Sequence, residues 1–185
     1  MQISDESDNE INSTVFPISN YYTCLLRSLL FANNEVASSN SPKGLAPDIE
    51  LKSHKGKKIS LTKLRGKMVL VDFWASWCGP CRKEIPNVVE AYHKYRKKKF
   101  INGKGFTILS VSLDREASAW KEAIKSDGMV WKYHGLDEGN KVSNLYGVYS
   151  IPSAFLVDGN GEIVAKGNDL RGINLHITLD KFLKQ

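Results

Sequence analysis

The sequence predicts an α/β fold in which a mixed central β-sheet is covered by helices on both faces. From residue 46 onward, short apolar segments typical of strands alternate with segments whose apolar residues have helical spacing. Near the C-terminus, two strand-like segments separated by Gly159-Asn160-Gly161 predict a β-hairpin, and a last helix follows. This order of elements favours a mixed sheet between two helical layers.

The chain divides into an N-terminal extension, residues 1–44, and one domain, residues 45–185. The full length of 185 residues suits a single domain with a hydrophobic core plus an extension. The extension is acidic at its start and contains the short apolar segment YYTCLLRSLLF, whose spacing suits one amphipathic helix. Its acidic start and the interruption by Arg27 make it a poor signal peptide. We expect Cys24, which lies in this extension, to be dispensable.

The first elements of the domain are short. APDIEL and KKISL read as two strands, which form an N-terminal strand or hairpin addition to the sheet, and Ser60 is expected to cap a helical turn. The apolar segment MVLVDFW at residues 68–74 predicts a buried strand. A long helix follows, with one apolar face: Ile85, Val88, Val89, Tyr92 and Tyr95.

The second half of the domain continues the alternation. FTILSVSL predicts a buried strand, and residues 117–125 predict a helix with Trp120 and Ile124 facing inward. A short helix is expected near residues 141–146. SAFLVD and EIVAKG form the predicted hairpin, and the terminal helix carries an apolar stripe: Leu175, Leu179, Phe182 and Leu183.

The net charge of +6 is unevenly spread, because residues 37–185 hold 25 basic and 15 acidic side chains. The densest basic run, Lys94 and residues 96–99, falls where the long helix should end, and cations there complement the helix dipole. We therefore expect a solvated helix end and no nucleic-acid partner. No apolar run approaches the roughly 18 residues needed to span a bilayer, so no transmembrane segment is expected.

The segment DFWASWCGPC at residues 72–81 carries the chemistry. The predicted strand leads into the turn 75–77, which places Cys78 at the N-terminus of the long helix. Unpaired N–H groups and a partial positive charge at a helix N-terminus favour thiolate over thiol, so Cys78 should be the nucleophile. Cys81 lies one turn deeper in the helix and should be the resolving cysteine that closes a disulfide with Cys78.

The residues around the pair shape access to it. Gly79 lets another chain approach closely, and Pro80 sits in the first helical turn, where its missing N–H is no loss. Trp77 offers a flat apolar surface beside Cys78 on which a partner can rest. We therefore place Trp77, Gly79 and Pro80 in the substrate-binding surface.

Two other interpretations of the pair are disfavoured. Zinc takes about four ligands, and neither a second CxxC motif nor a His pair at ligand spacing is present; the histidines are dispersed: His54, His93, His134 and His176. A purely structural disulfide across two residues restrains almost nothing in the unfolded chain. We expect no metal.

The segment VDFWASWCGPC, followed some 70 residues later by SIPSAFLVDGNGEIV, resembles the thioredoxin superfamily. APDIEL, the helix start CRKEIP and the insertion around residues 114–146 resemble its TlpA-like branch, the bacterial envelope thioredoxins of thiol–disulfide interchange and cytochrome c maturation. The resemblance covers about residues 45–184. It implies a thioredoxin-like fold, no cofactor, and the bacterial periplasm or cell envelope as the compartment.

The resemblance also implies roles for further residues. Ile151-Pro152 matches the family's cis-proline opposite the cysteine pair, where the residue before the proline offers its backbone to the substrate. Asp72 matches the buried acid that accepts a proton from the buried cysteine, and burial should raise its pKa; a surface-facing carboxylate is the alternative. Glu84 matches an acid that tunes the cysteines, although a solvated helix carboxylate is an open alternative. Pro86 is expected to kink the helix.

Peroxiredoxins share the fold, but their Pro-x-x-x-Thr-x-x-Cys pattern is absent here, since Val71 stands seven residues before Cys78. The expected function is thiol–disulfide exchange by a monomeric enzyme that reduces a disulfide-bearing protein substrate and is itself reduced by an upstream thiol reductant. A disulfide isomerase and a non-catalytic interaction module with a vestigial CxxC motif remain the alternatives.

Overall fold

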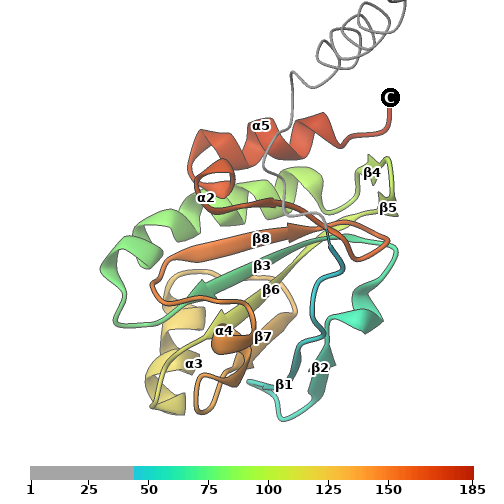
Figure 1. The fold of residues 1–185 in the computed structure, drawn as a ribbon. Coiled ribbons are helices and arrows are strands. Elements are labelled where there is room, and N and C mark those ends of the chain that lie inside the picture. The colour runs from blue at the N-terminus through green and yellow to red at the C-terminus, as the bar shows by residue number, and fades with distance from the viewer. Residues whose placement is uncertain (1–43) are drawn as a thin grey trace, which may run out of the picture. The chain divides into compact units, whose positions relative to one another are not determined.

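The computed structural model describes residues 44–185, which form a seven-stranded mixed sheet with helices on both faces (Figure 1). The strand order is β2-β1-β7-β6-β3-β8-β9. The three central strands β7, β6 and β3 are parallel, whereas β8, β9, β1 and β2 join antiparallel. The strands are β1 Glu50–Ser53, β2 Lys58–Ser60, β3 Met68–Trp74, β6 Phe106–Ser112, β7 Tyr133–Leu136, β8 Ser153–Val157 and β9 Ile163–Lys166.

The helices divide between the two faces of this sheet. They are α2 Gly79–Tyr95, α3 Ala117–Ser126, α4 Lys141–Leu145 and α5 Ile173–Lys181. Helices α2 and α5 lie side by side along one face (Figure 1), and their buried residues share a core with those of α3 and with Met68 and Leu70 of β3. The other face of β3, with Val69 and Val71, packs against α4 and the segment before β3. Successive side chains of β3 thus point alternately into the two cores, as expected for a strand whose two faces are both covered.

Most predicted elements are confirmed. The strands at 68–74 and 106–112, the helices from residues 79 and 117, and the C-terminal hairpin lie where the pattern places them. Trp120 and Ile124 are buried, as are Leu175 and Leu179. Phe182 and Leu183 follow the end of α5 and are only partly buried against the core.

The predicted helical turn near Ser60 is present, but the prediction that Ser60 caps it is wrong. A 3-10 helix spans Thr62–Leu64, but its N-cap is Leu61, and Ser60 is the last residue of β2. The carboxylate of Asp48 accepts the Thr62 N–H at 2.9 Å, so an acid from an earlier segment satisfies the helix start.

One strand of the main sheet and one small hairpin were not predicted. Strand β7 holds His134 and Gly135 and has no apolar alternation. Gly135 is needed there because a Cβ would lie 2.7 Å from the side chain of Leu51 in the neighbouring antiparallel strand β1. The small hairpin of β4 Lys99–Phe100 and β5 Gly103–Lys104 follows α2 directly.

The predicted amphipathic helix and Cys24 lie outside the described residues, so the division at residues 44 and 45 stays a prediction. Within residues 44–185, no helix is long and apolar enough to cross a membrane.

Candidate redox site

Cys78 and Cys81 occupy the first turn of α2. Cys78 is the N-cap residue with extended backbone, and its Sγ accepts a hydrogen bond from the Cys81 N–H at 3.2 Å. The two sulfurs form a disulfide. A sulfur atom in the N-cap position accepts one of the unpaired amides of the helix start, as an oxygen does in common caps. The same position stabilises negative charge, so the geometry favours a thiolate at Cys78 once the disulfide is reduced.

The two sulfurs differ in their surroundings although both cysteines are buried in the disulfide form. Both side chains belong to the same core, with Cys78 5% and Cys81 3% exposed, but Cys78 is flanked by the exposed residues Trp77 and Gly79, and Cys81 lies one turn further into α2. The side chain of Trp77 is 66% exposed, which is unusual for so large an apolar group. Trp77 therefore presents an exposed apolar side chain next to Cys78 in the chain.

The loop before Cys78 is held by Asp114, a buried residue just beyond β6. One carboxylate oxygen accepts the Ser76 N–H at 2.9 Å, and the other accepts the Ser76 hydroxyl at 2.5 Å. The hydroxyl of Ser112 donates to the same carboxylate at 2.7 Å. Three donors on one buried carboxylate fix the position of the turn that delivers Cys78 to the helix start.

Ile151 and Pro152 lie beside this turn. The pairing of Ser153 with Phe73 places them next to the C-terminal end of β3, from which the chain runs to Cys78. Their peptide bond is cis. The guanidinium of Arg171 donates a hydrogen bond to the Pro152 carbonyl and so ties this loop to the segment before α5.

Glu84 is not a solvated helix carboxylate. Its Oε1 accepts the Gly172 N–H at 2.6 Å and the side-chain amide of Asn87 at 2.8 Å. The Asn87 amide also donates to the Gly172 carbonyl at 3.0 Å. Glu84 therefore fastens α2 to the segment that carries Arg171. Pro86 lies inside α2, which continues through it from Gly79 to Tyr95.

Asp72 is the one acid within β3, where it pairs with Ser110 of β6 and Ala154 of β8. Burial of its carboxyl raises the pKa to about 7, the charge of Arg171 opposes that rise, and the charge of Glu84 adds to it. At neutral pH this carboxyl is therefore poised between its two protonation states and is suited to exchanging a proton.

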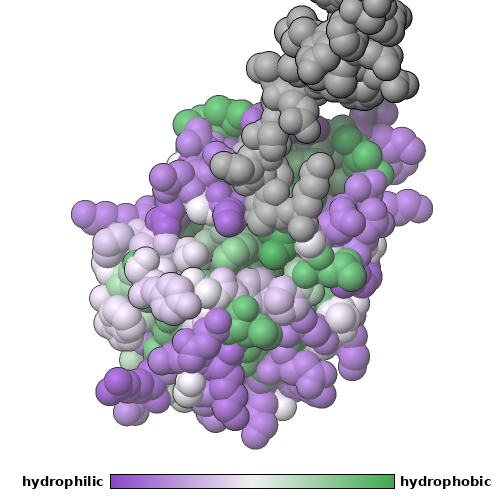
Figure 2. Space-filling view, in the orientation of Figure 1, coloured by the Kyte–Doolittle hydropathy of each residue, from purple (hydrophilic) through white to green (hydrophobic). Residues whose placement is uncertain are grey.

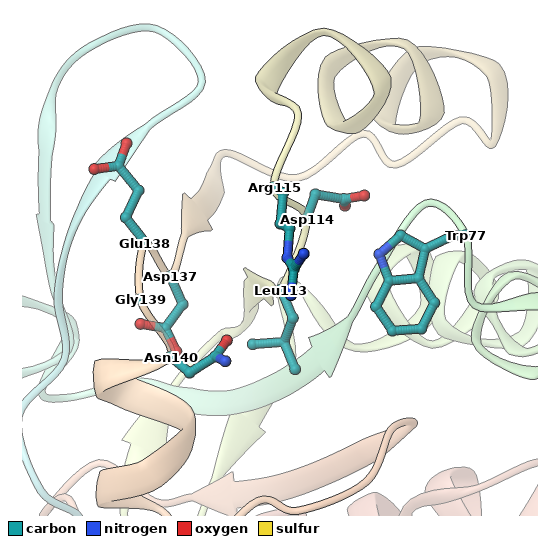
Figure 3. Close-up of a pocket in the computed structure, with 8 residues that line it drawn as sticks. All are labelled: Trp77, Leu113, Asp114, Arg115, Asp137, Glu138, Gly139 and Asn140. Atoms are coloured by element: carbon teal, nitrogen blue, oxygen red, sulfur yellow. The ribbon is translucent and has the colours of Figure 1, made fainter.

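A groove of about 550 Å³ opens on the other side of Trp77, where the carboxyl ends of β3, β6 and β7 meet (Figure 3). The Trp77 indole forms one wall, Leu113 lies at the base, and Glu138 and Asn140 stand opposite (Figure 3). The Arg115 side chain points into the groove between them (Figure 3). Ligands of open α/β sheets commonly bind at this kind of edge.

Sequence reasoning missed two residues of this site. Asp114 and Arg171 reach the redox turn and the cis-proline loop through contacts between distant segments of the chain. The aspartate directly after a buried strand was the only available hint for Asp114. Within residues 44–185, no three His, Cys, Asp or Glu side chains gather as a metal site requires.

Comparisons with known proteins agree with this geometry. The model of the AhpC/TSA family matches residues 42–166. The thiol-disulfide oxidoreductase ResA of Bacillus thuringiensis (strain Al Hakam) is 36% identical over 119 residues, which are 64% of this chain and 65% of that relative, slightly under two thirds of its length. ResA of Bacillus subtilis (strain 168) is 33% identical over 135 residues, which are 73% of this chain and 70% of the relative.

Solved structures give the same result. The thioredoxin domain of a thiol-disulfide oxidoreductase from Bacteroides vulgatus has a TM-score of 0.69 and 38% identity, covering 79% of this chain and 100% of its own. A putative protein disulfide isomerase from Bacteroides thetaiotaomicron has a TM-score of 0.58 and 29% identity, with coverage of 74% and 84%. The fold is thus thioredoxin-like, as the sequence predicted.

Proposed function

The chain belongs to the AhpC/TSA family, and on that premise we propose that it is a thiol–disulfide oxidoreductase that reduces disulfide bonds of partner proteins through Cys78 and Cys81. The observation that carries the proposal is the place of the pair: Cys78 caps α2 next to an exposed tryptophan, and Cys81 is its buried disulfide partner. This arrangement supports Cys78 as the sulfur that meets the substrate and Cys81 as the sulfur that resolves the mixed disulfide.

The exchange takes two steps from the reduced enzyme. The Cys78 thiolate attacks one sulfur of the substrate disulfide, a mixed disulfide forms, and the other substrate sulfur leaves as a thiolate that takes up a proton. Cys81, as a thiolate, then attacks the Cys78 sulfur and releases the second substrate thiol. The enzyme ends in the disulfide form, having passed two electrons to the substrate, and an upstream dithiol must reduce it again.

Asp72 is our proposed proton acceptor for the second step. Cys81 is buried and must lose its proton before it attacks, and the partly buried Asp72 carboxyl, with a pKa of about 7, can take that proton near neutral pH. The charges of Glu84 and Arg171 act on Asp72 in opposite directions. We therefore propose that Glu84 tunes the cysteine pair by raising the pKa of Asp72. Arg171 lowers the same pKa and so acts in the opposite direction.

The substrate should lie across Trp77, Gly79 and Pro80 on one side of Cys78 and against the backbone of Ile151 on the other. Gly79 supports this path, since a Cβ built there meets nothing within 4 Å. Pro152 holds the Ile151 backbone beside the end of β3. An extended segment of the substrate can pair with such a backbone as a strand does.

Disulfide isomerase is the second candidate, and the likeness to a putative isomerase from B. thetaiotaomicron supports it. The Gly-Pro spacer favours the reductase, because that spacer accompanies the reducing members of the superfamily that this chain resembles. We propose the bacterial periplasm or cell envelope as the compartment on the same resemblance, with the enzyme acting as a monomer.

Reduction of insulin by dithiothreitol tests the activity. The full chain should accelerate the reaction, and Cys78→Ser should not. Equal rates of insulin reduction with and without the protein would indicate a non-catalytic interaction module. Equilibration of the Cys78–Cys81 pair with glutathione buffers then separates the two enzymes, since a reductase pair stays oxidised in buffers that already reduce an isomerase pair.

A further inference from the structure

The end of the domain opposite the redox pair is strongly basic. Strand β3 runs from Met68 to Trp74, a length of about 20 Å, and Cys78 follows its C-terminal end. At its N-terminal end the hairpin of β4 and β5 lies against the start of β3, because the Lys104 N–H donates to the Gly66 carbonyl at 2.7 Å. The two ends of this strand therefore carry different surfaces.

Five exposed lysines from four segments meet at this end, and we call them the basic end: Lys67, Lys98, Lys99, Lys104 and Lys184. Main-chain hydrogen bonds hold these segments together, from Gly105 to Lys98 at 2.8 Å and from Lys184 to Lys99 at 2.9 Å. The ion pairs among the described residues join other side chains, so none of the five lysines has a carboxylate partner there.

Part of the basic end is unfavourable for the stability of the isolated protein. Lys99 and Lys104 face each other directly across the antiparallel pair, and like charges in that position repel. Ile101, in the turn of the same hairpin, is 63% exposed. A hollow of about 520 Å³ lies between Lys99, Lys104, Lys184 and Ile101. In Figure 2 the region over β4 and β5 shows hydrophilic residues around a hydrophobic area.

We propose that the basic end is a membrane-contact surface that binds anionic phospholipid headgroups, with Ile101 entering the interface between headgroups and acyl chains. Lysines near an anionic bilayer attract it, and an exposed apolar side chain among them adds the burial of its surface. Headgroup phosphates would also relieve the repulsion between Lys99 and Lys104. The redox pair would then face away from the bilayer, toward substrates in the aqueous phase.

The start of the described domain lies at the same end. Ala46 N–H donates to the Gly161 carbonyl at 2.9 Å, and the turn that contains Gly159 touches the hairpin through the bond from Asn102 to Asp158, also 2.9 Å. Leu45, which bridges to Glu162, is 69% exposed. A second exposed apolar side chain therefore lies beside the turn that contacts the hairpin.

A lipid surface fits these residues better than a nucleic acid does. Sequence-tolerant nucleic-acid binding relies on exposed aromatic rings among the cations, and the aromatic residue of this hairpin, Phe100, is 2% exposed. The exposed apolar residues here are aliphatic. Binding of a single-stranded oligonucleotide through these lysines, without vesicle binding, would therefore contradict the proposal.

Vesicle sedimentation of the full chain tests the proposal. The chain should bind vesicles of equal parts phosphatidylglycerol and phosphatidylcholine and bind phosphatidylcholine vesicles more weakly. The triple variant Lys99→Gln/Lys104→Gln/Lys184→Gln should lose about a hundredfold in affinity for the anionic vesicles, at about fivefold per lysine. The matched control Lys55→Gln/Lys57→Gln/Lys125→Gln removes the same charge from exposed lysines elsewhere and should lose less than about threefold.

Two further measurements make the result specific to the hairpin. Ile101→Ser should weaken binding about tenfold, whereas Val130→Ser, at an exposed valine elsewhere, should not. Amide hydrogen exchange in residues 96–104 should slow when anionic vesicles are added. All variants should reduce insulin at the parent rate, which shows that they are folded.

Three outcomes would overturn the proposal. Equal losses in the two triple variants would mean that net charge alone acts. Unchanged exchange in residues 96–104 on saturation with anionic vesicles would place any contact elsewhere in the chain. A gel shift of an oligonucleotide that depends on the three lysines, without vesicle binding, would assign the surface to nucleic acid.

Discussion

The carboxylate of Asp114 accepts hydrogen bonds from both the N–H and the hydroxyl of Ser76, at 2.9 and 2.5 Å. Ser76 lies two residues before Cys78, so a side chain just beyond β6 holds the turn that places the Cys78 sulfur at the start of α2. The position of the turn before Cys78 thus depends on Asp114, which lies 38 residues after Ser76 in the chain.

Asp114→Ala should therefore lower both the stability and the reactivity of the enzyme. The loss of a buried acceptor leaves the Ser76 N–H unpaired, and we expect a cost of about 3 kcal/mol in the free energy of unfolding. Urea denaturation of the oxidised protein measures it. In the reduced protein, Cys78 should react more slowly with iodoacetamide at neutral pH.

Asp137→Ala is the matched control for this change. Asp137 is also buried, and its carboxylate accepts the Val142 and Ser143 N–H groups and not those of the redox turn. It should lose stability to a similar extent and leave the alkylation rate of Cys78 unchanged. Equal slowing of alkylation in both variants would show that Asp114 acts through general stability alone.

Glu84 and Arg171 should move the pKa of Asp72 in opposite directions. The charge of Glu84 raises that pKa and the charge of Arg171 lowers it, so Glu84→Gln should decrease it and Arg171→Gln should increase it. Carbon-detected NMR titration of the Asp72 carboxyl in the oxidised protein gives both values. Glu90→Gln, on the exposed face of α2, is the control and should cause no change. Shifts of the same sign in the first two variants would contradict the arrangement.

Asp72→Asn should slow the second chemical step and spare the first. Attack of Cys78 on a substrate disulfide needs no proton transfer to Asp72, whereas resolution by Cys81 loses its acceptor and should slow by about a hundredfold near neutral pH. The deficit should shrink at higher pH, where Cys81 ionises unaided. Stopped-flow measurement of the two steps across pH separates them. Equal rates of resolution in the variant and the parent at neutral pH would return Asp72 to a structural role.

His134 should make the fold sensitive to acid. Burial lowers its pKa from 6.5 to about 4, so between these values the unfolded chain binds the proton and the folded protein does not. Its contribution to stability is therefore complete above about pH 6.5 and falls by about 3 kcal/mol as the pH drops to 4. Asp72 has the opposite slope in this range, because its pKa is raised to about 7 in the folded protein.

Urea denaturation between pH 4 and 7 in the Asp72→Asn background isolates the histidine. The free energy of unfolding should rise with pH there, and a further His134→Gln change should remove about 3 kcal/mol of that rise. His93→Gln, at an exposed histidine, should leave the slope unchanged. A slope that survives His134→Gln would assign the acid sensitivity to other groups.

The sequence predicted those parts of the fold and site that depend on local pattern. The strand at 68–74, the turn and the helix start are contiguous, so the periodicity of apolar residues and the Gly-Pro spacer were sufficient to place Cys78 at the N-cap. The hairpin of β8 and β9 followed equally from its Gly-Asn-Gly turn.

The missing parts depend on contacts between distant segments. Glu84 offered two interpretations because its partner, the Gly172 N–H, lies 88 residues away. Strand β7 escaped prediction because Gly135 is selected by the close approach of Leu51 and weakens the local strand pattern. The effect of Arg171 on Asp72 depends on how α2, β8 and the segment before α5 pack together, which no local pattern encodes.

The trapping of mixed disulfides tests the central claim, that Cys78 attacks and Cys81 resolves. Reduced Cys81→Ser protein, incubated with oxidised substrate protein, should accumulate covalent adducts that mass spectrometry locates at Cys78, because the resolving sulfur is gone. Reduced Cys78→Ser protein should form few adducts, since Cys81 is 3% exposed and lies one turn further into α2 than Cys78. Adducts that form through Cys81 in Cys78→Ser, and not through Cys78 in Cys81→Ser, would contradict the account.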